Sequence, residues 1–126
     1  MNAARTPKPG TTWLTVAAAQ TEVHAFGFCV ATRSGPSCNH QRVNRAQVRL
    51  CCDWLQTFGR KTKTIRRQRS SYGYKHEVER WASSSGKHVY ISNGAFIVAA
   101  KRAGYTIEQA DHALSPNAFF NLAVAR

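Results

Sequence analysis

A run of cations between Arg60 and Arg69 is the part of the sequence best suited to chemistry with a ligand. Its six basic side chains are Arg60, Lys61, Lys63, Arg66, Arg67 and Arg69. Cations at this density attract phosphates and release counterions, which gives an affinity that is independent of sequence and weakened by salt. Thr62, Thr64 and Gln68 can add hydrogen bonds to phosphate oxygens. The run therefore predicts a nucleic-acid contact; its alternatives are a docking site for an acidic protein or a solvated loop without function.

The net charge of +12 is concentrated in the middle of the chain. Residues 33–69 hold ten Lys or Arg against Asp53 alone, a net of +9. Residues 1–32 hold two cations against one carboxylate, and residues 70–126 hold six against four. A localised excess of this kind predicts a polyanionic partner more strongly than an evenly basic surface does.

A predicted helix from Asn44 to Phe58 places two more cations beside this run. Its apolar residues recur at i, i+3, i+4 and i+7, and Gly59 is a typical stop signal. Arg45 and Arg49 fall on the opposite, polar face. Downstream, an exposed aromatic beside a basic groove can stack on the bases of a single strand, and Tyr72 is the candidate. We predict nine nucleic-acid-binding residues: Arg45, Arg49, Arg60, Lys61, Lys63, Arg66, Arg67, Arg69 and Tyr72.

The cysteines and histidines do not predict a metal site. Cys29, Cys38, His40, Cys51 and Cys52 contain no Cys-x-x-Cys or His-x-x-x-His spacing. Adjacent residues on a helix point about 100° apart, which is a poor geometry for the Cys51–Cys52 pair to chelate a metal. We therefore predict reduced structural thiols and no metal or other cofactor.

His76 and Glu79 are the pair that could act in a small nuclease, with Lys75 and Arg80 nearby. A general acid–base site normally gathers several convergent titrating groups, however, and mixed-charge helix faces are usually solvated surface. We therefore predict no catalytic residue and a non-enzymatic protein, with the nuclease as the weaker alternative.

Three helices in a basic chain also resemble a helix-turn-helix arrangement, but the details argue against it. The connection from Ser84 to Ile91 is about twice the usual three- or four-residue turn. The third helix is apolar nearly all round, so it offers few groups to base edges. A winged variant with strands at 88–91, 105–108 and 119–124 is the version left open.

The remaining elements follow from periodicity and caps. A second helix is predicted to begin after Ser70 or Ser71 and to end at Ser83, with Lys75, His76, Glu77, Glu79 and Arg80 in solvent. Ser92 caps a third helix, from about Asn93 to Ala103, that should be central in the core.

Strands are predicted on either side of these helices. Residues 23–31 are β-branched and aromatic enough for a strand, and residues 33–43 are predicted to be a loop. At the C-terminus, alternation of Phe120, Leu122 and Val124 favours a strand over a helix starting at Ser115-Pro116.

Two stretches carry a resemblance to known proteins: Arg69-Ser-Ser-Tyr-Gly-Tyr-Lys-His-Glu-Val-Glu-Arg-Trp and Tyr90-Ile-Ser-Asn-Gly-Ala-Phe-Ile-Val-Ala-Ala. They resemble small uncharacterised proteins carried by bacterial phages, plasmids and other mobile elements, over roughly residues 46–125. That group has no established activity, so the resemblance transfers no catalytic or binding residue. It implies the tasks of small mobile-element proteins: regulating transcription, handling DNA, or blocking a host defence such as a CRISPR complex.

Together these features predict an α+β fold: a three-helix core at residues 44–103 with a few short flanking strands forming a small sheet. Residues 1–11 are predicted to be a mobile arm before one domain at 12–126. No apolar run approaches the roughly 20 residues of a membrane span, and a cytoplasmic location is predicted. The predicted partner is DNA or RNA; the alternative is an inhibitor or adaptor that docks an acidic or RNA-containing host complex.

Overall fold

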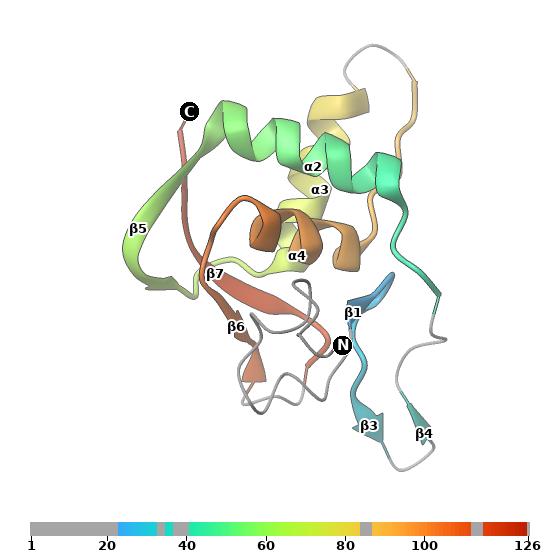
Figure 1. Ribbon diagram of the computed structural model, residues 1–126. Helices are drawn as coiled ribbons and strands as arrows, with labels where there is room; N and C mark the ends of the chain where they lie inside the picture. Colours follow the sequence, from blue (N-terminus) through green and yellow to red (C-terminus); the bar gives the residue numbers. More distant parts are fainter. Residues whose placement is uncertain (1–22, 33–34, 37–40, 84–86, 112–114, 126) are drawn as a thin grey trace, which may run out of the picture.

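The computed structural model describes residues 23–32, 35–36, 41–83, 87–111 and 115–125, and Figure 1 shows its elements. Within these ranges, helices and small antiparallel sheets give an α+β architecture, as predicted. The predicted arm at residues 1–11 lies outside the described residues, and so do Cys38 and His40.

The predicted helices are confirmed, with caps at the expected residues: α2 (Arg45–Phe58), α3 (Ser71–Ala82) and α4 (Asn93–Arg102). The side chain of Asn44 accepts a hydrogen bond from the N–H of Gln47 at 3.0 Å. Ser70 and Ser92 cap α3 and α4 in the same way. Each cap satisfies a backbone N–H that the helix itself leaves unpaired. No helix in the described part of the chain has the length and apolar character needed to cross a membrane.

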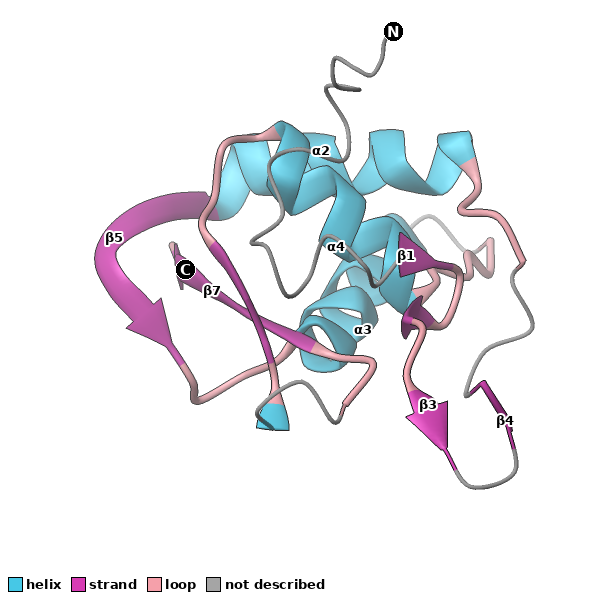
Figure 2. Cartoon of the chain, turned by 60° about the horizontal axis from the view of Figure 1, so that its bottom comes forward, coloured by secondary structure: helices cyan, strands magenta, loops and turns pink. Residues whose placement is uncertain are grey.

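A three-stranded antiparallel sheet lies beside the helices, in the order β5 (Gly59–Arg66), β7 (Ala118–Val124), β6 (Ile107–Gln109). In Figure 2, β5 leaves the end of α2 and curves around β7. The register passes from Lys61↔Leu122 to Arg66↔Phe120, so β5 bulges between these two pairs. Asn121 bridges the irregular stretch: its Nδ2 donates to the carbonyl of Thr62 at 3.0 Å, and its Oδ1 accepts from the N–H of Thr106 at 2.7 Å.

The sheet corrects two expectations and confirms a third. Most of the basic run is the edge strand β5, so the solvated-loop alternative is wrong for residues 60–66. Residues 88–91 form no strand, because the N–H of Val89 donates to Ser83 at the end of α3 and the N–H of Ile91 donates to Glu79 of α3, instead of to a neighbouring strand. The C-terminal strand is confirmed, with alternate residues of β7 buried.

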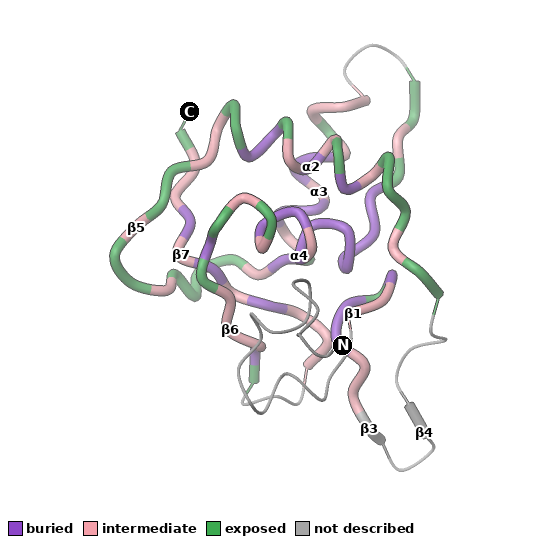
Figure 3. Tube along the Cα trace, in the orientation of Figure 1, coloured by how far each residue is buried: buried purple, intermediate pink, exposed green. Residues whose placement is uncertain are grey.

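Helix α4 is the centre of the core, as its uniform apolar character predicts (Figure 3). Phe96 stacks on Tyr74 of α3 with ring centroids 5.3 Å apart. It also meets Trp54 of α2 edge-on at 6.0 Å and Phe120 of β7 at 5.4 Å. These aromatic contacts join all three helices to the sheet, and such pairs add about 0.5–1.5 kcal/mol each beyond their burial.

The first third of the described chain differs from the single strand predicted at residues 23–31. Two short antiparallel pairs form instead: β1 (Val23–His24) with β2 (Gly27–Phe28), and β3 (Ala31–Thr32) with β4 (Gly35–Pro36). The chain reverses at Ala25 and Phe26, and Gly27, which begins β2, has a φ of +114° that is open to glycine and strained for other residues. Strand β4 also lies in the stretch predicted to be a loop.

The cysteines differ in their redox state. Cys51 and Cys52 are free thiols, as predicted, but Cys29 is disulfide-bonded. The predicted reduced state is therefore wrong for Cys29.

Gly94 is required where the first turn of α4 meets the β1–β2 hairpin. Its N–H donates to the carbonyl of Ala25 at 2.9 Å, and a Cβ at this position would overlap the backbone carbonyl of His24. Gly94→Ala is therefore expected to lower the free energy of unfolding by about 1–3 kcal/mol, the usual effect of overpacking. Denaturant unfolding measures it. Gly73→Ala is the control, since its Cβ would meet only the flexible side chain of Arg69; equal loss in both variants would contradict the prediction.

Candidate nucleic-acid interface

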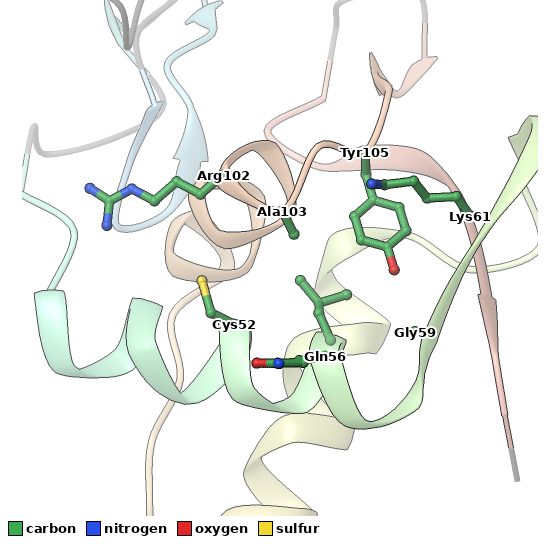
Figure 4. Close-up of a pocket in the computed structure, with 8 residues that line it drawn as sticks. Cys52, Gln56, Gly59, Lys61, Arg102, Ala103 and Tyr105 are labelled. Atoms are coloured by element: carbon green, nitrogen blue, oxygen red, sulfur yellow. The ribbon is translucent and has the colours of Figure 1, made fainter.

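A groove runs between α2, the end of α4 and the start of β5. It consists of two adjoining hollows of about 550 and 410 Å³, which share Cys52 and Arg102 as lining residues. We call it the α2–α4 groove. In Figure 4 the Cys52 thiol points from α2 toward α4, and Arg102 extends from the end of α4. The cations that line it are Arg45, Arg49, Lys61 and Arg102.

The electrostatics of the α2–α4 groove favour an anion. No carboxylate lines either hollow, and none of the four cations makes an ion pair within the part of the chain that the structure describes. The nearby Asp53 is exposed on α2 but lies outside the lining. The four cations around the two adjoining hollows therefore generate a positive potential that an incoming phosphate would meet.

Two ionisable side chains that line the groove, Cys52 and Tyr105, stay protonated at neutral pH. Burial raises the pKa of Cys52, Arg102 lowers it and Asp53 raises it, with a net increase. The thiol is therefore a poor nucleophile. Burial also raises the pKa of Tyr105, whose ring lies 5.4 Å from the Nζ of Lys61. The groove accordingly offers hydrogen-bond donors and positive charge, a combination that suits phosphate binding more than catalysis.

The structure divides the nine predicted binding residues among several places. Arg45, Arg49 and Lys61 come together in the α2–α4 groove. Three cations of β5 are exposed but line neither hollow: Arg60, Lys63 and Arg66. Tyr72 is exposed, as predicted, but lines a different hollow.

Two of the predicted cations make structural ion pairs. The guanidinium of Arg67 binds both carboxylate oxygens of Glu108, with Nε 2.9 Å from Oε1 and Nη2 3.1 Å from Oε2. Arg69 pairs with the buried Glu77. These contacts fasten the segment after β5 to β6 and α3, so both side chains contribute less to an external anion site than their charge implies.

Arg102 is the groove residue that sequence reasoning missed. Arg102 lies in the last turn of α4, where a cation interacts favourably with the helix dipole. No local sequence pattern indicates a second role for this residue. Its place in the groove depends on α4 packing across α2, which brings Arg102 beside Cys52 from a distant part of the sequence.

The His76–Glu79 pair does form, but in a structural network. His76 Nδ1 lies 2.9 Å from Glu79 Oε1, while Glu79 Oε2 accepts from Lys75 Nζ at 3.1 Å and from the N–H of Ile91 at 2.9 Å. The expectation that Lys75, Glu77 and Glu79 face solvent is wrong: Lys75 and Glu77 are buried, and Glu79 is mostly so. A carboxylate with this many fixed donors is occupied in holding α3 to the segment before α4.

Metal-binding geometry is absent from the described part of the chain, where no three His, Cys, Asp or Glu side chains are close enough to hold an ion. Comparisons with protein-family models, with curated proteins and with solved structures find no match.

Proposed function

We propose that the protein is a non-enzymatic nucleic-acid-binding protein and that the α2–α4 groove holds the phosphate backbone. The observation that carries this proposal is the set of four cations around two joined hollows, with no carboxylate among the described residues that line them. Three of the four are arginines, whose planar guanidinium binds phosphate oxygens in pairs.

The charge of the whole chain supports a polyanion as the partner. Three carboxylates already pair with cations inside the fold, namely Glu77, Glu79 and Glu108. With a net charge of +12, the surface is left with a large cationic excess. Nucleic acid presents a phosphate at every nucleotide, so it can neutralise several of these cations at once.

A salt titration with labelled duplex and single-stranded DNA and RNA tests the proposal. If four phosphates contact the four groove cations, affinity should fall about 50- to 150-fold between 50 and 200 mM salt, since log affinity changes by roughly 0.7–0.9 per contact for each decade of salt. The two ends of this range apply to single strands and duplex respectively. Fluorescence anisotropy measures the affinity at each salt concentration and so gives the slope of log affinity against log salt.

Absence of binding to all of these nucleic acids at 50 mM salt would overturn the proposal. The alternative is then an inhibitor or adaptor whose cationic surface docks an acidic protein complex. The resemblance to proteins of mobile elements is compatible with either role, and that origin remains part of the proposal.

A further inference from the structure

A hollow of about 630 Å³, separate from the α2–α4 groove, gathers exposed aromatic side chains. Among the described residues, the exposed large apolar side chains are Phe26, Tyr72 and Tyr90, at 48%, 53% and 52% exposure, and all three line this one hollow. They come from the β1–β2 turn, the start of α3 and the segment before α4. We call the hollow the aromatic cleft. Exposed rings that converge in this way from separate elements mark a binding site more often than scattered ones do.

A buried cation holds two of the rings in place. Lys75 is only 6% exposed, yet its Nζ lies 4.6 Å from the ring centroid of Tyr90 and 5.4 Å from that of Tyr72. Its charge is balanced by Glu79, which lies outside the lining. Tyr72 also meets His76 edge-on at 4.6 Å. Both tyrosines are therefore oriented before any ligand arrives, which reduces the entropy lost on binding.

Asn93 adds a polar group to the wall of the cleft. Its Nδ2 donates to the carbonyl of Phe26 at 2.9 Å and to Oδ1 of Asn117 at 2.9 Å. Its own Oδ1 is buried and accepts no hydrogen bond within the described chain. A buried acceptor without a donor is costly, and a ligand N–H that reached it would remove that cost.

We propose that the aromatic cleft binds an unpaired nucleobase of a single strand. A base offers flat π faces to the tyrosine rings and N–H groups at its edge, whereas a proline ring offers no N–H. No carboxylate among the residues that the structure describes lines the cleft, so none of these residues repels the phosphates beside the base. The inference rests on the proposed function, because the base belongs to the strand whose backbone the α2–α4 groove holds.

The placement of the two sites sets the scale of that strand's length. The cleft adjoins the start of α4 at Asn93, and the groove adjoins its end at Arg102. The 10 residues of α4 separate them by about 15 Å at 1.5 Å per residue. At the spacing of about 3.4 Å per stacked nucleotide, about four or five nucleotides span this separation.

The test compares two eight-nucleotide single strands with equal numbers of phosphates, one with bases and one made of abasic sites. The wild-type protein is expected to bind the base-containing strand about 5- to 140-fold more tightly, the range for one stacked base. Tyr72→Leu with Tyr90→Leu should abolish this preference, and Tyr72→Phe with Tyr90→Phe should keep it. Both tyrosines are exposed, so the substitutions leave the core intact. Arg49→Gln is the control, because it should weaken both strands alike.

Each outcome separates the cleft from the groove. Equal affinity of the wild type for the two strands overturns the cleft and leaves the groove standing. Failure of both strands to bind while duplex binds overturns the cleft, and failure of single strands and duplex alike overturns the proposed function. In that case the riboside of 2-aminopurine, which has no phosphate, still tests the cleft: quenching by the wild type but not by the double leucine variant supports it. Displacement of the riboside by a proline-rich peptide that itself binds more tightly would identify a protein partner and overturn the inference.

Discussion

Glu79→Ala is expected to lower the free energy of unfolding by about 3–5 kcal/mol, the cost of leaving a buried charge without its partner. The carboxylate is the counterion of Lys75 and the acceptor for the N–H of Ile91. Lys75 is buried beneath Tyr72 and Tyr90 and cannot recover its solvation without moving both rings. Urea denaturation at neutral pH, followed by circular dichroism, measures the loss.

Two further variants make this expectation specific. Arg80→Ala removes a neighbouring exposed side chain and should change stability by no more than about 0.5 kcal/mol. Glu79→Gln keeps an oxygen acceptor but removes the charge, so it should fall between the two. If the alanine variants at 79 and 80 unfold at the same denaturant concentration, Glu79 does not hold α3 in the way inferred.

The same carboxylate sets part of the pH dependence of stability. Burial raises the pKa of Glu79, but the N–H of Ile91, Lys75 and His76 lower it more strongly, and the net pKa lies below the ordinary value of 4.5. A depressed pKa in the folded state stabilises the protein above pH 4.5, and this stabilisation disappears as the pH falls through the folded pKa. The wild type should therefore lose stability below pH 4.5 more steeply than the Glu79→Ala variant does.

Local sequence rules predicted the helices because local contacts form them. The spacing of Val48, Cys51 and Leu55 directs one face of α2 into the core, and all three residues are buried. Ser92 and the apolar run after it were enough to place α4 at the centre. The same rules predicted β7, because alternation along a half-buried strand is also a local pattern.

The same rules gave wrong predictions where contacts between distant residues determine the structure. Lys75 and Glu77 lie on the polar side of α3 by periodicity, but Tyr90 and Arg69 cover them from outside the helix. The high charge of β5 masked a strand whose partner, β7, comes more than fifty residues later. Edge strands tolerate such charge, and lysines on an edge discourage pairing with other chains. Thr62, Thr64 and Ile65 are the β-branched signal that could have revealed it.

Only part of the candidate site could be predicted, because local spacing identifies the cations but not which of them the fold brings together. Arg45 and Arg49 could be assigned to one helix face from their spacing, and the cationic run next to them was plain in the sequence. Which cations share a hollow depends on how α4 crosses α2 and on where β5 turns. Those relations decide that Arg102 joins the groove, while Arg67 and Arg69 are committed to Glu108 and Glu77.

Neutralising three groove cations together, as Arg49→Gln, Lys61→Gln and Arg102→Gln, should reduce affinity for nucleic acid by roughly 10³-fold at 50 mM salt. Each phosphate contact contributes about 0.9 to the slope of log affinity against log salt for duplex. Each contact therefore raises the affinity roughly tenfold when the salt concentration is lowered from about 1 M to 50 mM. The slope itself should become shallower by about 2.7 for duplex. Anisotropy titrations at several salt concentrations measure both quantities.

The matched control removes the same charge elsewhere, as Arg66→Gln, Arg80→Gln and Lys87→Gln, all at exposed positions that line neither hollow of the groove. If binding depended only on net charge, the two triple variants would lose affinity and salt slope equally. If the groove holds the backbone, the control keeps most of its affinity, because cations that touch no phosphate act only through a field screened beyond about 10 Å at 0.1 M salt. An equal loss in the two variants would therefore reject the groove as the interface even if nucleic acid still binds the wild type.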